Sequence, residues 1–211
     1  MIKKLLYLLY IGVLVPVTAF AQINTDRVMT IGKNALYFED YVLSIQYFNQ
    51  VINAKPYLAD PYFYRGLAKM NLDDYPGAER DCSEALERNP FVVNAYQVRG
   101  ISRIRQKNYK GAIEDYQRAL KLDPENISLW HNLVLCRMQE KDYTTAQAEL
   151  DTIIRISPRY TDAYLMRVEN FAEVERYAAS HERCGPGHRN GPLQSRYMVF
   201  KRYAVYDALQ I

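Results

Sequence analysis

The sequence has few cysteines, almost no excess charge and none of the common catalytic motifs. Its three cysteines are an odd number and lie far apart, whereas disulfide-stabilised domains carry a dense, even set. Removing Lys3 and Lys4 from the 27 basic residues leaves 25 against 24 acidic ones, with no basic stripe, so neither nucleic acid nor an anionic membrane is indicated as a partner. The chain lacks a phosphate-binding glycine loop, a nucleophile elbow, a zinc-protease helix and a paired-thiol motif. These absences argue against an enzyme, and we expect no cofactor.

The first 21 residues have the layout of a secretory signal peptide. A positively charged start, residues 1–4, precedes an apolar run over 5–20, and Ala19-Phe20-Ala21 has the form of an A-x-A cleavage site. The apolar run is short for a membrane span, which needs about 20 residues. We therefore expect export to a bacterial periplasm or the cell exterior, with cleavage near Ala21; the alternative is an uncleaved anchor.

A repeat of 34 residues runs through the middle of the chain. Four prolines recur at this interval, and each is preceded at fixed distances by an Asp/Asn-Tyr pair and by a small residue. A glycine also precedes the first three prolines at a fixed distance, and Val134 takes its place in the fourth copy. Agreement at so many positions identifies an internal repeat. The repeated residues are Pro56, Pro90, Pro124 and Pro158, then Asp40, Asp74, Asn108 and Asp142, then Ser44, Ala78, Ala112 and Ala146, and finally Gly32, Gly66 and Gly100.

Each copy contains two runs of helical periodicity, for example over 96–103 and 112–120 in the third copy. The Asp/Asn-Tyr turn separates the two helices, and proline ends the second. Glycine and alanine allow two helices to approach closely. Because a single helix pair cannot bury its apolar face alone, we expect the pairs to stack into a curved array. The predicted fold is an all-α, right-handed solenoid of antiparallel helix pairs.

The third copy resembles the tetratricopeptide repeat (TPR) family. The resemblance covers about residues 25 to 160 as four units, 25–58, 59–92, 93–126 and 127–160. It departs from the family pattern at Val134, at Cys82 and Leu150 in the aromatic position, and at Val51 and Ile153 in the second small position, which suggests local repacking. The residues that carry the resemblance in the third copy are Tyr96, Gly100, Ala112, Tyr116, Ala119 and Pro124.

The resemblance implies a protein or peptide partner held on the concave face, which the first helix of each pair lines in this family. Only Lys33 resembles the Lys/Asn clamp with which some members hold a terminal carboxylate, so the predicted groove is mostly apolar and suits a hydrophobic segment or amphipathic helix. The alternative is that some of these residues only pack between units. The fifth, ninth and twelfth places of the units give Met29, Lys33, Phe63, Leu67, Met70, Gln97, Ile101, Ile104, His131, Leu135 and Met138.

Two arginines stand directly before the glycines of the second and third copies. Arg65 and Arg99 each have an aspartate sixteen residues later, Asp81 and Asp115, on the facing helix of the same pair. Because buried charges need partners, we predict two structural ion pairs, with a ligand-facing role as the alternative.

The repeat breaks down towards the end of the chain. Residues 161–180 begin a fifth unit and are expected to form a capping helix, whereas 181–211 should be an irregular tail because its Gly/Pro segment cannot be helical. The aromatic, basic end of this tail could dock in the groove, add a strand to a partner or stay disordered, and a shifted reading frame or truncated gene is a further explanation.

His181, Cys184 and His188 have spacings that could meet a soft metal, although a Gly/Pro loop with incidental polar residues is the simpler interpretation. Together these features predict an exported, non-enzymatic binding scaffold. A structural or assembly subunit of a cell-envelope complex, acting through its convex face or tail, is the alternative.

Overall fold

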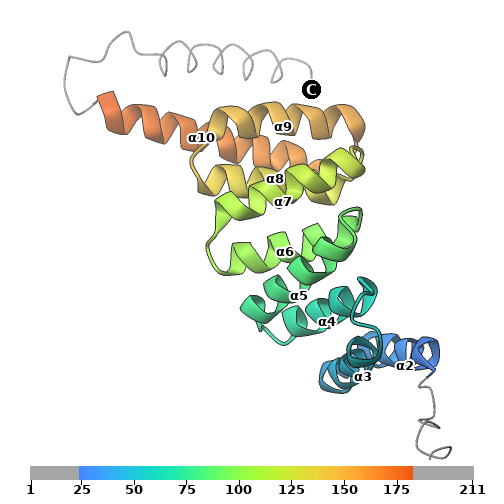
Figure 1. Ribbon diagram of the computed structural model, residues 1–211. Helices are drawn as coiled ribbons and strands as arrows, with labels where there is room; N and C mark the ends of the chain where they lie inside the picture. Colours follow the sequence, from blue (N-terminus) through green and yellow to red (C-terminus); the bar gives the residue numbers. More distant parts are fainter. Residues whose placement is uncertain (1–23, 183–211) are drawn as a thin grey trace, which may run out of the picture.

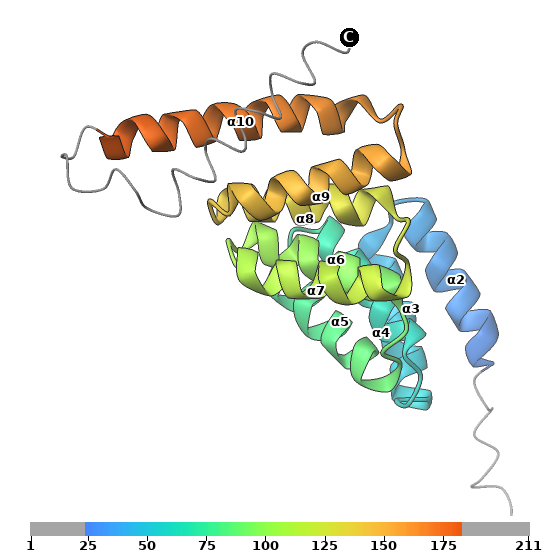
Figure 2. The same cartoon turned by 90° about the horizontal axis from the view of Figure 1, so that it is seen from above.

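The computed structural model describes residues 24–182, and the side chains of 24–177 within them. The signal peptide expected at 1–21 and most of the expected tail lie outside this range. In the described part, helices follow one another in antiparallel pairs without an intervening strand, and Figures 1 and 2 show them in chain order from α2 at one end to α10 at the other. The helices are α2 Thr25–Tyr37, α3 Tyr41–Ala54, α4 Asp60–Asn71, α5 Tyr75–Arg88, α6 Val93–Arg105, α7 Tyr109–Leu122, α8 Ile127–Gln139, α9 Tyr143–Ile156 and α10 Thr161–Glu182.

The turn inside each pair has the same construction in all four copies. Its last residue is an Asp or Asn whose side chain accepts a hydrogen bond from a backbone N–H in the first turn of the second helix, as Asn108 does from Gly111 at 3.1 Å. This bond satisfies one of the unpaired N–H groups at the helix start. The residue before this cap is left-handed, with φ of 62° at Glu39 and 61° at Asp73, Lys107 and Lys141.

Close contact between the two helices of a pair depends on the residue at the glycine position. A Cβ atom added to Gly100 would lie 2.8 Å from Cζ of Tyr116, and one added to Gly32 would lie 2.7 Å from Cε1 of Phe48. These glycines make room for the aromatic rings of the second helices. The fourth pair solves the same packing problem with Val134 against the smaller Leu150, both fully buried.

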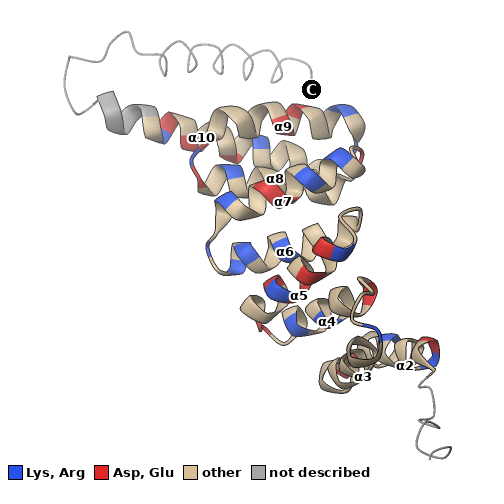
Figure 3. Cartoon of the chain, in the orientation of Figure 1, with Lys and Arg blue, Asp and Glu red and all other residues tan. Residues whose placement is uncertain are grey.

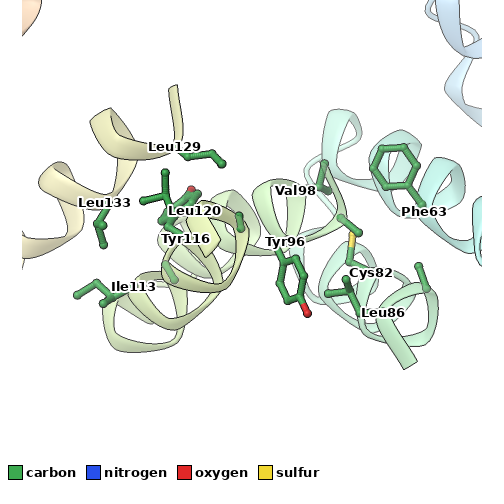
Figure 4. Packing of buried hydrophobic residues seen from close by; sticks show 14 of the residues in the cluster. Phe63, Cys82, Leu86, Tyr96, Val98, Ile113, Tyr116, Leu120, Leu129 and Leu133 are labelled. Atoms are coloured by element: carbon green, nitrogen blue, oxygen red, sulfur yellow. The ribbon is translucent and has the colours of Figure 1, made fainter. Parts of the chain in front are cut away.

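One core cluster extends across pairs rather than lying within each of them. Figure 4 shows Tyr116 and Leu120 of α7 beside Leu129 and Leu133 of α8, so the second helix of one pair packs on the first helix of the next. Continuous burial of this kind is what makes the array of helix pairs cooperative.

The helix expected at 161–180 is present as α10, which packs on α9. It continues to Glu182, two residues beyond the range expected from the sequence. Among the described residues, no helix follows α10 and packs on it as a second helix. None of the described helices is long and apolar enough to cross a membrane.

Candidate functional site

The predicted groove residues lie on the first helices α2, α4, α6 and α8, and most of them are half-buried. Leu67, Met70 and Ile104 pack partly against the main core cluster, while Leu135 has 39% of its surface exposed. We call Leu67, Met70, Ile104 and Leu135, which come from α4, α6 and α8, the apolar row. Met29, Gln97, Ile101 and Met138 are also half-buried.

Phe63 does not lie on an open face. Only 8% of its surface is exposed, and it belongs to the main core cluster together with Tyr62. Its ring also contacts that of Tyr64, with 4.9 Å between centroids. This burial favours the alternative interpretation, in which Phe63 packs between units.

Two polar groove residues are already engaged by neighbouring pairs. The Nζ atom of Lys33 lies 4.4 Å above the ring of Tyr64, which itself stacks on Phe48. His131 Nδ1 lies 2.9 Å from the hydroxyl of Tyr160, in the turn before α10. Both side chains thus link one helix pair to the next, and neither is arranged as a carboxylate clamp or an acid–base pair.

Asp81 and Asp115 each form the ion pair with arginine that the sequence predicts. Arg99 Nη2 lies 2.6 Å from Asp115 Oδ1, and Arg65 Nη2 lies 2.6 Å from Asp81 Oδ1. Asp115 is fully buried and Asp81 nearly so. The fork of Nε and Nη2 matches the two carboxylate oxygens, the geometry in which guanidinium groups bind carboxylates best.

Each aspartate has a second basic partner that the sequence analysis missed. Lys69 Nζ lies 2.8 Å from Asp81 Oδ2, and Arg103 Nη1 lies 2.9 Å from Asp115 Oδ2. The second cation comes from one helical turn after the arginine, at i+4, which places both on the same helix face. A search for basic residues four positions beyond Arg65 and Arg99 would have found them.

The arginines also reach back to the preceding helix pair. Arg65 Nη1 donates to Asn49 Oδ1 at 2.6 Å, and Arg99 Nη1 donates to Ser83 Oγ at 3.1 Å. In both cases the acceptor lies sixteen residues earlier. Arg167 repeats this backward contact with Asp151 at 3.5 Å. We call Arg65, Arg99 and Arg167 the arginine ladder.

The ladder is interrupted in the fourth pair, where Leu133 stands in the arginine position. The acidic place there is Glu149, whose Oε1 accepts from Arg137 Nε at 3.3 Å. Its Oε2 atom is buried and has no hydrogen-bond partner within the described residues. Burial, opposed by Arg137, raises the pKa of Glu149 to about 7. A carboxyl group of this kind is half-protonated near neutral pH.

The described cysteines have no catalytic environment. Cys82 and Cys136 are buried free thiols, and burial raises the pKa of each to about 12, so neither ionises near neutral pH. Between residues 24 and 177, no three His, Cys, Asp or Glu side chains gather to hold a metal. Of the weak metal candidates, Cys184 and His188 lie outside the described residues, as does the side chain of His181.

Charged residues are spread unevenly over the helices, since α3 has none. Figure 3 marks Lys/Arg and Asp/Glu on the ribbon; α6 has three arginines and no acidic residue, whereas α5 carries both signs. The basic side chains of the first helices are largely paired with carboxylates of the second helices, as Arg65, Arg99 and Arg137 are.

Comparison with known proteins identifies the repeat independently. Family models described as tetratricopeptide repeat match residues 63–127 and 103–168, which together span half of the chain. No curated protein matches the sequence significantly.

Solved structures share the architecture. A crystal structure of MamA protein is 17% identical, with 86% of this chain and 94% of that chain covered at a TM-score of 0.67. The first TPR of Spaghetti (RPAP3), bound to the HSP90 peptide SRMEEVD, is 25% identical, with coverage of 56% and 95% and a TM-score of 0.54. The Arabidopsis OM64 TPR domain is also 25% identical, with coverage of 54% and 94% and a TM-score of 0.53. By its 34-residue period, its paired helices and these matches, the chain belongs to the tetratricopeptide repeat family.

Proposed function

We propose that this protein is an exported, non-enzymatic scaffold that holds a hydrophobic segment or amphipathic helix of another protein against its first helices. The observation that carries the proposal is the apolar row on α4, α6 and α8, of which Leu135 is the most exposed member. An amphipathic helix recognises such a row through apolar residues spaced three and four apart. Its charged face then remains in water.

The similar RPAP3 domain binds the peptide SRMEEVD, which carries three acidic residues. The corresponding face of this chain has one lysine at the fifth, ninth and twelfth places, Lys33, and that lysine lies over the ring of Tyr64. An acidic peptide would find little complementary charge here. We therefore expect an apolar partner in place of an acidic chain end.

Two leucines with equal exposure allow a matched test. Leu135 on α8 and Leu122 at the end of α7 each expose 39% of their surface, but only Leu135 belongs to the apolar row. We expect Leu135→Asp to remove binding of an amphipathic helical peptide, measured by fluorescence anisotropy, and Leu122→Asp to leave it within twofold. Circular dichroism checks that both variants keep their helix content. Equal affinity of both variants for the peptide would overturn the proposal.

A separate binding experiment tests whether the partner is apolar or acidic. SRMEEVD labelled with a fluorophore should bind at least tenfold more weakly than an uncharged amphipathic peptide of similar length. If SRMEEVD binds more tightly, and Lys33→Ala abolishes that binding, the face is a carboxylate clamp. Export is tested separately, by mass spectrometry of the N-terminus of the protein recovered from the cells that make it.

A further inference from the structure

The last helix of the array exposes an apolar face that the other first helices bury. Val168 lies 34 residues after Val134 and therefore occupies the same place in the repeat. Val134 is fully buried beneath α9, whereas Val168 exposes 70% of its surface. The same residue type in the same register thus lies in opposite environments, because no described helix follows α10.

The surrounding residues share this difference. Tyr164 exposes 37% of its surface, while Tyr96, two repeats earlier at the same place, exposes 7%. Phe171 lies one turn beyond Val168 and is half-buried. We call Tyr164, Val168 and Phe171 the open face of α10. A helix that terminates a repeat array normally presents polar residues outward, so the expected capping role is incomplete without something that covers this face.

We propose that residues 193–211 of the same chain pack on the open face of α10, in the place that the second helix of a pair takes elsewhere in the array. The inference does not depend on the proposed function. It rests on three properties of α10 and the segment after it: reach, charge and apolar content.

The connection is long enough. Residues 183–192 contain three glycines and two prolines and can span up to about 33 Å when extended. The path back from the end of α10 to Val168 measures about 21 Å, because fourteen helical residues rise 1.5 Å each. Residues 193–211 can therefore reach the whole open face.

The charges are complementary. Helix α10 carries five acidic and two basic residues, a formal charge of −3, whereas 193–211 carry three basic and one acidic residue, a formal charge of +2. Opposite net charges favour this pairing over that of two copies of α10, which would repel each other. The segment also supplies the apolar and aromatic side chains that the open face needs, namely Tyr197, Met198, Val199, Phe200, Tyr203, Val205 and Tyr206.

The test places a photo-crosslinking residue, p-benzoylphenylalanine, at position 168 of the full chain. The control carries it at position 91, where Phe91 exposes 73% of its surface in the turn before α6. An equal mixture of isotopically light and heavy protein is irradiated and analysed by mass spectrometry. We expect crosslinks from position 168 to peptides within 193–211 of the same copy, at least fivefold above those from position 91.

Each other outcome overturns the proposal. Crosslinks that join light and heavy copies would assign the open face to a second copy of the chain. Yields at position 168 no higher than at position 91 would mean that the segment does not pack there. As a second measurement, Lys201→Glu combined with Arg202→Glu should lower the same-copy yield severalfold while the thermal melting of the array stays unchanged; an unaltered yield would remove the charge argument.

Discussion

The guanidinium of Arg99 holds the carboxylate of Asp115 across the third helix pair, with Nη2 2.6 Å from Oδ1 and both residues buried. The same guanidinium donates to Ser83 of the preceding pair. One side chain therefore connects α6 to α7 and to α5, so the ion pair also sets how neighbouring pairs stack.

Removing the carboxylate alone should cost more than removing both charges. Asp115→Ala removes the carboxylate partner of the buried Arg99 and leaves Arg103 with Glu79 alone, and we expect a loss of about 3–5 kcal/mol in the free energy of unfolding. Adding Arg99→Leu, the residue type found at Leu133, should restore at least 1 kcal/mol of that loss, roughly the scale of one charged hydrogen bond. Urea unfolding measures both variants, with Glu114→Ala on the exposed side of α7 as the control. Equal losses of unfolding free energy in the single and double variants would show that the two charges do not stabilise each other.

Glu149 should make stability depend on pH. Its pKa is raised to about 7 in the folded protein, against 4.5 without burial, so the folded state binds the proton more tightly. The contribution of Glu149 to the free energy of unfolding is therefore highest below pH 4.5 and falls as the pH rises to 7. Glu149→Gln stays neutral and should be more stable than the parent protein at pH 8 by on the order of 1–2 kcal/mol. Urea titrations from pH 4.5 to 8 check this, and parallel pH profiles for the two proteins would contradict it.

The left-handed turn residues offer a stabilising change. Lys107 has φ of 61°, a conformation that costs a residue with a Cβ atom about 1 kcal/mol and that glycine adopts freely. Lys107→Gly should raise the free energy of unfolding by about 0.5–1 kcal/mol. Arg118→Gly, at an exposed site inside α7, should lower it by about 1 kcal/mol. Chemical denaturation that finds both changes destabilising would show that the turn carries no strain.

The glycine at position 100 should not tolerate a methyl group while Tyr116 is present. The added Cβ would lie 2.8 Å from Cζ of that fully buried ring, so Gly100→Ala is expected to cost about 1–3 kcal/mol despite its better helix propensity. Combining it with Tyr116→Leu, as Val134 is combined with Leu150, should cost less than the sum of the two single changes. Thermal melts of the three variants form a double-mutant cycle, and strict additivity would rule out the steric contact.

Much of the fold was predictable because the same local sequence signals, the helix caps and the turn residues, occur in all four copies of the repeat. The caps Asp40, Asp74, Asn108 and Asp142 start the second helices, and the family matches confirm the tetratricopeptide assignment. The spacing of sixteen between Arg99 and Asp115 indicated two groups on facing helices of one pair. Such signals survive in the sequence because they act between residues close in the chain.

The groove was harder to predict because register does not fix exposure. Phe63 and Leu135 were both placed on the binding face, yet Phe63 is buried in the core cluster and Leu135 is open. The volume of each side chain and the approach of the neighbouring helix decide which way such a residue lies. Backward contacts such as Arg99 to Ser83 also depend on how one pair stacks on another.

The sequence by itself determined the period, the turns, the helix ends and the arginine–aspartate pairs of the second and third copies, because these depend on residues within one repeat. Only the tertiary structure decided which apolar residues are covered. Val134 and Val168 have the same side chain and the same place in the repeat, but one is fully buried and the other 70% exposed. Burial is a property of the neighbour that packs on a residue, and that neighbour is supplied by the stacking of the pairs.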